Sequence, residues 1–146
     1  MAGSYSLGIQ SVAAASGAAF FTMHTGANIR ARIQEIGLFV NAATASSVGL
    51  IRPSNSPVAT TSVLGLAEDP ADPASTLNLD TAWSTAPTIG TSFLRRITIP
   101  ATIGNGVIWS WPPGQELVIP VSSFLVFWNF GALAGSVLNA YVKWFE

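Results

Sequence analysis

The sequence predicts an all-β protein: a single antiparallel β-sandwich, or jelly-roll-like domain, of about nine short strands. Two observations carry this prediction. Stretches in which apolar and polar residues alternate recur along the chain, and turns rich in Gly, Pro and Asn separate them. No stretch with helical periodicity is long enough for a helix of three turns. Many short strands without long helices are typical of an antiparallel sandwich or barrel.

The clearest strand is predicted at Ile29–Asn41. Apolar residues occupy every second position up to Ile33, and again from Ile36 onward, but in the opposite phase. A strand cannot change the face that it buries without an irregularity. The pattern therefore predicts a β-bulge or a sharp bend near Gln34–Glu35.

Residues 1–16 form either an N-terminal extended arm or the first edge strand, and residues 17–146 form the sandwich domain. Apolar side chains alternate with polar ones in this segment, which indicates extended backbone. Ala13–Gly17 is too short to hold a helix alone, so a flexible link is expected there. A second strand is expected at Ala18–Thr25, followed by a turn at Gly26–Asn28.

The middle of the chain is less regular. A strand at Val48–Arg52 ends where prolines begin, because proline cannot donate to a strand ladder. Between Pro53 and Gly90 a long structureless loop would be uncommon. We expect one short strand near Thr60–Leu66 and a turn or two of helix near Ala74–Trp83.

The last third of the chain returns to regular alternation. Gly104-Asn105-Gly106 is typical of a type I′ hairpin turn between neighbouring strands. Arg95 and Arg96 are adjacent in a strand, so they point to opposite faces, and we expect one of them to lie against a carboxylate. The strands expected here are Thr91–Ile99, Val107–Trp111, Glu116–Pro120, Ser122–Phe130 and Ser136–Phe145.

Composition restricts the partners. Charged residues make up 9% of the chain, against about 25% in an average soluble domain. Either the surface is neutral and rich in Ser and Thr, or a partner covers part of it, and we favour the second. The six Lys and Arg residues form no basic stripe, so we expect no nucleic-acid partner. With no cysteine, disulfides and thiolate metal sites are excluded.

The stretch Leu117–Val142 contains no charged residue and needs an answer on membrane insertion. Proline, glycine, serine and asparagine interrupt it, whereas a spanning helix needs about 20 predominantly apolar residues. Two strands and a turn explain the stretch better, and no membrane partner is expected. The N-terminus lacks the positively charged start of a signal peptide.

No catalytic, cofactor-binding or metal-binding residue is predicted, and the chain is not expected to be an enzyme. His24 is the one histidine and has no carboxylate near it in sequence, so a structural role is favoured. The acidic cluster at Glu68–Asp72 lacks the pattern of a calcium loop and is interpreted as a proline-stiffened turn. Glu35 and Glu116 are conceivable as a carboxylate pair, but nothing in the sequence brings them together.

Five tryptophans remain to be placed. Trp109, Trp128 and Trp144 are expected in the core. Trp83 and Trp111 are candidates for an interface, since exposed aromatic rings can stack on sugars or contact a protein partner.

Several stretches together resemble small all-β proteins of tailed bacteriophages that are similar to capsid decoration (cement) proteins. They are Arg32–Pro53, Asp69–Ser75, Trp83–Pro87, Leu94–Ile97 and Ile108–Gly114. The resemblance implies a structural virion protein that binds the outer surface of the capsid and stabilises contacts between neighbouring capsomers.

The same resemblance implies the partners. They are the major capsid protein and further copies of the chain, with a trimer favoured. The protein would be assembled in the host cytoplasm, would lie on the capsid surface and would need no cofactor. Residues 1–16 would then be a docking arm, with Tyr5, Leu7 and Ile9 as contact residues.

Two other functions stay open. A phage tail, fibre or vertex module would bind a receptor, including a glycan, through surface aromatics. A small β-sandwich hydrolase would need a pocket that brings a carboxylate to His24, or two acids together.

Overall fold

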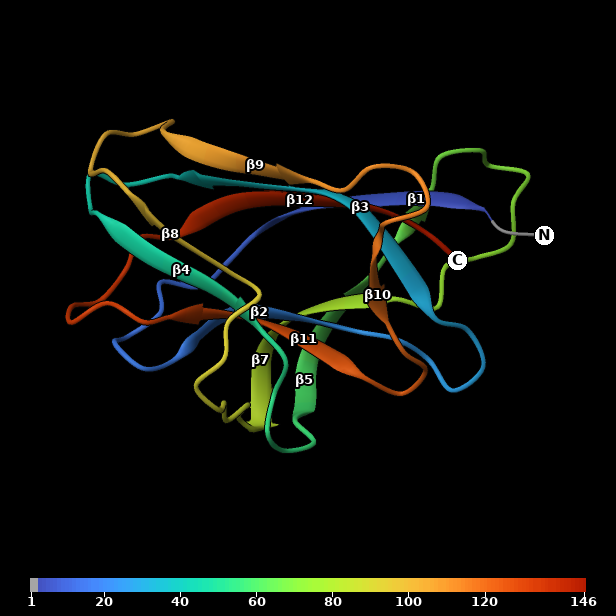
Figure 1. The fold of residues 1–146 in the computed structure, drawn as a ribbon, viewed down its shortest axis with the longest axis horizontal. Coiled ribbons are helices and arrows are strands. Elements are labelled where there is room, and N and C mark those ends of the chain that lie inside the picture. Colours follow the sequence, from blue (N-terminus) through green and yellow to red (C-terminus); the bar gives the residue numbers. More distant parts are fainter. Residues whose placement is uncertain (1–2) are drawn as a thin grey trace.

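The computed structural model describes residues 3–146, which form two antiparallel six-stranded sheets packed face to face (Figure 1). This confirms the predicted all-β sandwich, with twelve strands where about nine were expected. Among residues 3–146, no helix is long and apolar enough to cross a membrane. The strands are β1 Ser4–Gln10, β2 Ala19–His24, β3 Ala31–Val40, β4 Ser46–Ile51, β5 Val58–Leu64, β6 Leu66–Ala67, β7 Asn78–Thr85, β8 Arg95–Ile99, β9 Gly106–Ser110, β10 Leu117–Ile119, β11 Phe124–Asn129 and β12 Leu138–Phe145.

The first sheet has the order β10-β3-β12-β1-β6, with β9 also beside β3, and the second has the order β5-β7-β2-β11-β4-β8. The predicted bulge in β3 is confirmed. Glu35 lies opposite Lys143 and Ile33 lies opposite Trp144, so Gln34 is the extra residue. The bulge allows Ile33 and Ile36 to face the core together, and neither is exposed to solvent.

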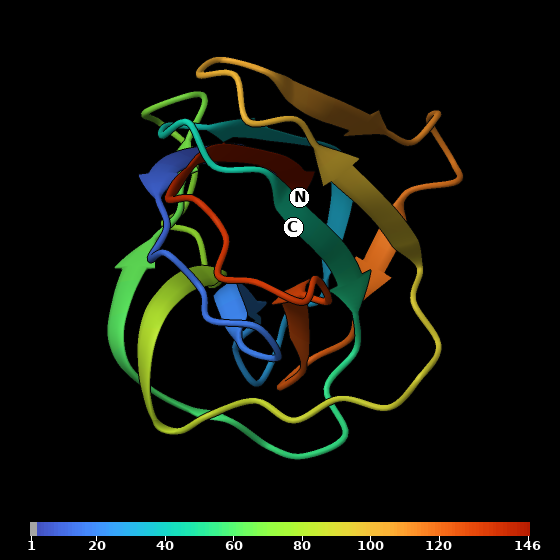
Figure 2. The ribbon, with the colours of Figure 1, turned by 90° about the vertical axis from the view of Figure 1, so that its left-hand side faces the viewer.

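The main core lies between the two sheets. The rings of Phe21 and Phe127 stack there with their centroids 3.9 Å apart, and Trp144 is fully buried. A second, smaller cluster forms around Ile51 and Val126 on the outer side of the second sheet. The segments before β5 and after β7 cross this outer side (Figure 2).

The first strand is part of the sandwich and not a projecting arm. It pairs with β12 along its whole length and with β6 at its start. Tyr5 and Leu7 are 3% and 7% exposed, and Ile9 is half-buried. Burial therefore corrects the expectation that Tyr5 and Leu7 contact a partner. Met1 and Ala2 of the expected arm lie outside the described residues.

The helix expected near Ala74–Trp83 is wrong. These residues lead into strand β7, in which Leu79 lies opposite Met23 and is fully buried. Core burial at alternate positions from Leu77 onward overrides the weak local tendency to form a helical turn. The short strand expected near Thr60–Leu66 is confirmed as β5. The expected link at Ala13–Gly17 contains no helix.

The type I′ hairpin expected at residues 104–106 is also wrong. Strand β8 pairs with β4 of one sheet and β9 pairs with β3 of the other, so the turn crosses between sheets. A type I′ turn needs two central residues with positive φ. Here Gly104 alone of the three has one, 88°. The turn instead hydrogen-bonds to Val40 of β3, which donates to Asn105 O.

Candidate functional site

A buried polar network lies on the outer face of the second sheet, where β5, β7 and β2 run side by side. Asp80 of β7 lies opposite Thr22 of β2 on one side and opposite Ser62 of β5 on the other. Residues directly opposite in an antiparallel pair point to the same face. The register therefore places the two hydroxyls beside the carboxylate.

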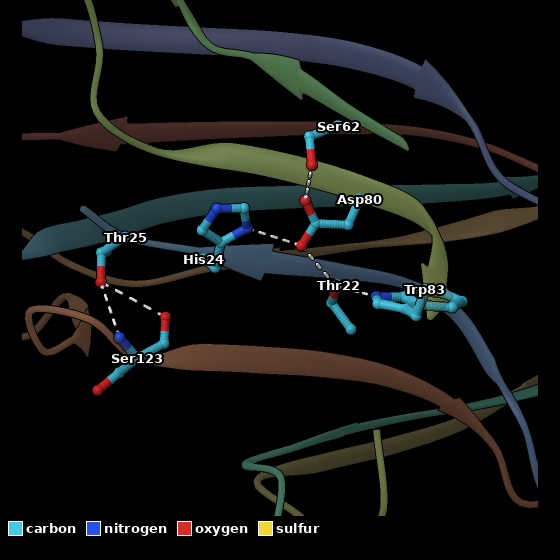
Figure 3. A network of polar contacts seen from close by, with 7 residues as sticks. All are labelled: Thr22, His24, Thr25, Ser62, Asp80, Trp83 and Ser123. Atoms are coloured by element: carbon cyan, nitrogen blue, oxygen red, sulfur yellow. Dashed lines mark hydrogen bonds and ion pairs between the residues drawn. The ribbon is translucent and has the colours of Figure 1, made fainter. Parts of the chain in front are cut away.

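Asp80 is 0% exposed and accepts hydrogen bonds from three side chains (Figure 3). Thr22 Oγ1 donates over 2.8 Å, His24 Nδ1 over 2.7 Å and Ser62 Oγ over 2.5 Å. The indole N–H of Trp83 donates to Thr22 Oγ1 over 3.0 Å. A buried carboxylate needs such donors, because its charge has lost its water.

The imidazole of His24 is the accessible end of this network, with its side chain 24% exposed. The Asp80 carboxylate fixes the proton on Nδ1, which is how an acid orients a histidine that acts as a general base. Both hydroxyls of the network donate to the carboxylate and not to the ring. Among residues 3–146, no hydroxyl is hydrogen-bonded to His24, so the arrangement supplies an oriented base without a hydroxyl nucleophile positioned by it.

The sequence did not predict a carboxylate beside His24, because Asp80 fell within the expected helical turn. A usable signal was present. Leu77 and Leu79 alternate with Asn78 and Asp80, and that period of two is typical of a strand with one polar face.

The two predicted interface tryptophans are half-buried. Trp83 packs against the second cluster, and its indole nitrogen is occupied by Thr22. Trp111 packs against the main core, and the guanidinium of Arg95 lies over its ring, 5.4 Å from the centroid. Of the three tryptophans expected in the core, Trp144 is fully buried, while Trp109 and Trp128 are half-buried against the two clusters.

The expectation that Arg95 or Arg96 lies against a carboxylate is wrong. Arg96 instead lies over the ring of Phe130, 4.1 Å from its centroid, and also over Phe93 at 5.2 Å. Aromatic faces attract cations without the need to bury an opposing charge. Both arginines remain exposed.

The conceivable carboxylate pair does not form a site. Glu35 accepts a hydrogen bond from Tyr141 Oη over 2.6 Å, and this bond raises the pKa of Tyr141 to about 12. Glu116 lies instead beside strand β10, where backbone N–H groups lower its pKa. Among residues 3–146, no three His, Asp or Glu side chains are grouped to hold a metal ion.

One side of the sandwich is an uncharged, exposed edge, which we call the β5–β6 edge and define as residues 58–67. Strand β5 is the edge of the second sheet, and after Gly65 the chain continues as β6 at the edge of the first. No residue from 58 to 67 is charged. Its exposed large apolar side chains are Val58 51%, Val63 46%, Leu64 44% and Leu66 64%.

Comparison with models of known protein families, with curated proteins and with solved structures finds no match to the chain.

Proposed function

We propose that the chain is a structural virion protein that binds the outer surface of a phage capsid and stabilises contacts between neighbouring capsomers. In this proposal it acts as a homo-oligomer, with a trimer favoured, and its main partner is the major capsid protein. The sequence resemblance to decoration proteins and the all-β sandwich support it. A surface poor in charge supports it as well, since such a surface favours burial against other proteins.

The β5–β6 edge is the observation that carries the proposal. An edge strand presents unpaired backbone N–H and C=O groups, and proteins usually protect such edges with charge or proline. Here ten consecutive residues contain neither, from Val58 to Ala67. Register shifts between β5 and β7 twist the edge but leave its apolar side chains exposed. A partner strand added along this edge would gain both backbone hydrogen bonds and apolar contact.

Such an edge suits repeated binding over a shell. Each contact contributes roughly 25 cal/mol per Å² of apolar surface removed from water, less the cost of association. Linking several copies in an oligomer raises the effective concentration of the remaining sites once one is bound. Modest single contacts then give stable attachment.

Copy number in the virion tests the proposal. Quantitative mass spectrometry of gradient-purified particles should give a ratio to the major capsid protein near one, or a simple fraction set by lattice symmetry. A handful of copies per particle would favour the tail, fibre or vertex module. Absence from particles would refute the proposal.

A pair of leucine variants tests the surface. Leu66→Lys places a charge on the β5–β6 edge, and Leu133→Lys places the same charge at an exposed leucine outside it. Purified Leu66→Lys protein should bind particles that lack the wild-type chain at least tenfold more weakly, whereas Leu133→Lys should bind like wild type. Equal binding by both would exclude this edge as the capsid contact.

The tail or fibre module has less support from the structure. It relies on a surface tryptophan that stacks on a sugar, and one face of Trp111 is already covered by Arg95. Glycan binding by the wild-type chain that is lost on Trp111→Ala substitution would support the tail or fibre module.

A further inference from the structure

A groove runs along strand β10, at the start of β3. Its hollow of about 570 Å³ is lined by Asn28, Arg30, Arg32, Glu116, Val118 and Glu146. A second hollow, of about 410 Å³, shares Asn28, Arg30 and Val118 and extends to Val121. We call these two hollows together the β10 groove.

Arginines surround this groove. Arg32 lies opposite Val118 in the sheet, and Arg52 reaches from the end of β4 to donate to Val118 O over 3.0 Å. Arg30 lines both hollows. Three of the six basic residues of the chain therefore flank one three-residue strand.

The groove holds two arginines and two acids, and Glu116 is the acid that faces Arg32, whose charge helps the backbone N–H groups to lower the pKa of that carboxyl. Among residues 3–146, the one ion pair with a nitrogen–oxygen distance within 4.0 Å joins His24 and Asp80, and it lies outside the groove. Of the two acids in the groove, Glu146 has its carboxylate occupied by donors from residues 75–77 and from Trp144. Arg30 is exposed, and the exposed side chains of Ile29 and Val121 line the same hollows.

The chain carries a segment with the matching chemistry. Residues 68–73, Glu-Asp-Pro-Ala-Asp-Pro, which we call the acidic loop, hold three of its seven acids and two of its nine prolines. Glu68 and Asp69 are exposed, and so are both prolines. Carboxylates pair with guanidinium groups, and the exposed proline rings would remove apolar surface from water against Ile29 and Val121.

The acidic loop is ordered before any partner binds. Glu68 N donates to Ser4 O over 2.8 Å and Tyr5 Oη donates to Pro73 O over 3.0 Å, which fixes both of its ends. Inside it, Ala71 N donates to Asp69 Oδ1 over 2.9 Å. A preformed loop loses little conformational entropy on docking. None of its residues lines the β10 groove of its own chain, so the loop is available to another copy.

We propose that the acidic loop of one copy docks in the β10 groove of the next, and that this contact joins the copies of the homo-oligomer. Because the loop and the groove are different surfaces, the contact can repeat head-to-tail from copy to copy, and it then closes into a ring when the rotation between copies allows. The inference rests on the proposed function for the expectation that the chain is a homo-oligomer, and it leaves the β5–β6 edge free for the capsid.

Charge exchange in the purified chain tests the contact without any virus particle. Arg30→Glu/Arg32→Glu reverses the groove, Glu68→Arg/Asp72→Arg reverses the loop, and the fourfold variant reverses both. Lys143→Glu is the control, since Lys143 lies exposed in β12. Sedimentation velocity over a micromolar concentration range gives the association constant, and circular dichroism verifies that each variant is folded.

Each double variant should weaken self-association by at least about tenfold, which corresponds to about 1.4 kcal/mol. The fourfold variant should regain it, because attraction is restored with the signs exchanged, and Lys143→Glu should match wild type. Wild-type association should weaken from about 0.1 M to about 1 M salt as the Debye length falls from about 10 Å to about 3 Å. A monomeric wild-type chain would overturn the inference, as would a folded fourfold variant that stays dissociated.

These failures are distinguishable from failure of the proposed function. A monomeric chain that is still found at lattice copy number would refute the loop–groove contact alone. An oligomer that responds to charge exchange but is absent from particles would refute the virion role alone.

Discussion

At the scale of single residues, Asp80 is the centre of a buried polar network that joins three strands. Its carboxylate is completely buried and both oxygens accept hydrogen bonds. Removing one partner of a buried network leaves the remaining donors without an acceptor, which costs more than the lost bond. The three donors to Asp80 come from two different strands, so the carboxylate also ties β2, β7 and β5 together.

We expect Asp80→Ala to lower the free energy of unfolding by about 3 kcal/mol, because the donors of Thr22 and His24 then lose their acceptor. Ser62→Ala removes a single donor from an exposed residue and should cost only about 1 kcal/mol. Urea unfolding at neutral pH, followed by tryptophan fluorescence, measures both. Equal losses in the two variants would show that the network does not act as a unit.

Thr22, His24 and Ser62 fall in strands expected from the sequence, whereas Asp80 was expected in a helical turn, and nothing in the sequence indicates that these residues meet. Alternation around Leu79 indicates which face Asp80 occupies, yet the pairing of β7 with β2 joins residues 56 positions apart, His24 and Asp80. Register between distant strands is set by the fit of all side chains on both faces, and one sequence does not display it.

At the scale of elements, β3 shows where sequence pattern is sufficient. The change of phase after Ile33 predicts the bulge because apolar side chains in a strand can occupy only two alternating sets of positions. One extra residue is the smallest irregularity that brings both sets to the same face. The bulged residue also binds the segment that follows β9, because Trp111 N donates a hydrogen bond to Gln34 O over 2.9 Å. The strand can therefore pair with β10 before the bulge and with β9 after it.

Deletion of Gln34 should abolish cooperative folding. Without the extra residue, one half of β3 must turn its apolar side chains outward and bring Arg32 toward the core. Exposing Ile33 costs about 2 kcal/mol and burying an unpaired charge costs several more, against a total stability of about 5–15 kcal/mol.

Gln34→Ala is the matched control for this deletion. It keeps the bulge and the backbone acceptor, so it should change the free energy of unfolding by less than about 1 kcal/mol. Thermal unfolding followed by circular dichroism compares the two variants. A deletion variant with a wild-type transition would mean that β3 slips in register at little cost.

Two elements were mispredicted for a common reason. The sequence Gly104-Asn105-Gly106 suits a hairpin, and the segment near Ala74 suits a helical turn, but both assignments use local preference alone. In the structure, backbone hydrogen bonds to Val40 determine the first turn, and burial of Leu79 determines the second segment. Tertiary contacts override local preference where that preference is weak.

At the scale of the whole molecule, Glu146 links the two sheets. It follows β12 of the first sheet and accepts hydrogen bonds from Thr76 N at 2.8 Å and Leu77 N at 3.1 Å, just before β7 of the second. Trp144 Nε1 donates to the same carboxylate over 3.0 Å. Burial alone would raise the pKa of Glu146, but the hydrogen bonds from Ser75, Trp144 and the backbone outweigh it and hold the pKa below its usual value.

This lowered pKa predicts how the stability of the sandwich depends on pH. A carboxyl group whose pKa is lower in the folded state stabilises the fold fully above the unfolded-state pKa, about 4.3 for Glu. That contribution is lost as the pH falls through the folded-state pKa, because the folded carboxylate must then take up a proton. Glu146→Gln cannot be protonated in this way, and its amide fits the same space.

We therefore expect wild type to be more stable than Glu146→Gln by a constant amount above about pH 5.5, with the difference shrinking below about pH 4. Urea unfolding of both proteins at a series of pH values measures this difference directly. The other titrating groups are common to both proteins, so their contributions to the free energy of unfolding cancel in this difference. A difference that stays constant down to pH values where wild type unfolds would mean that Glu146 stabilises the fold through shape and not through its charge.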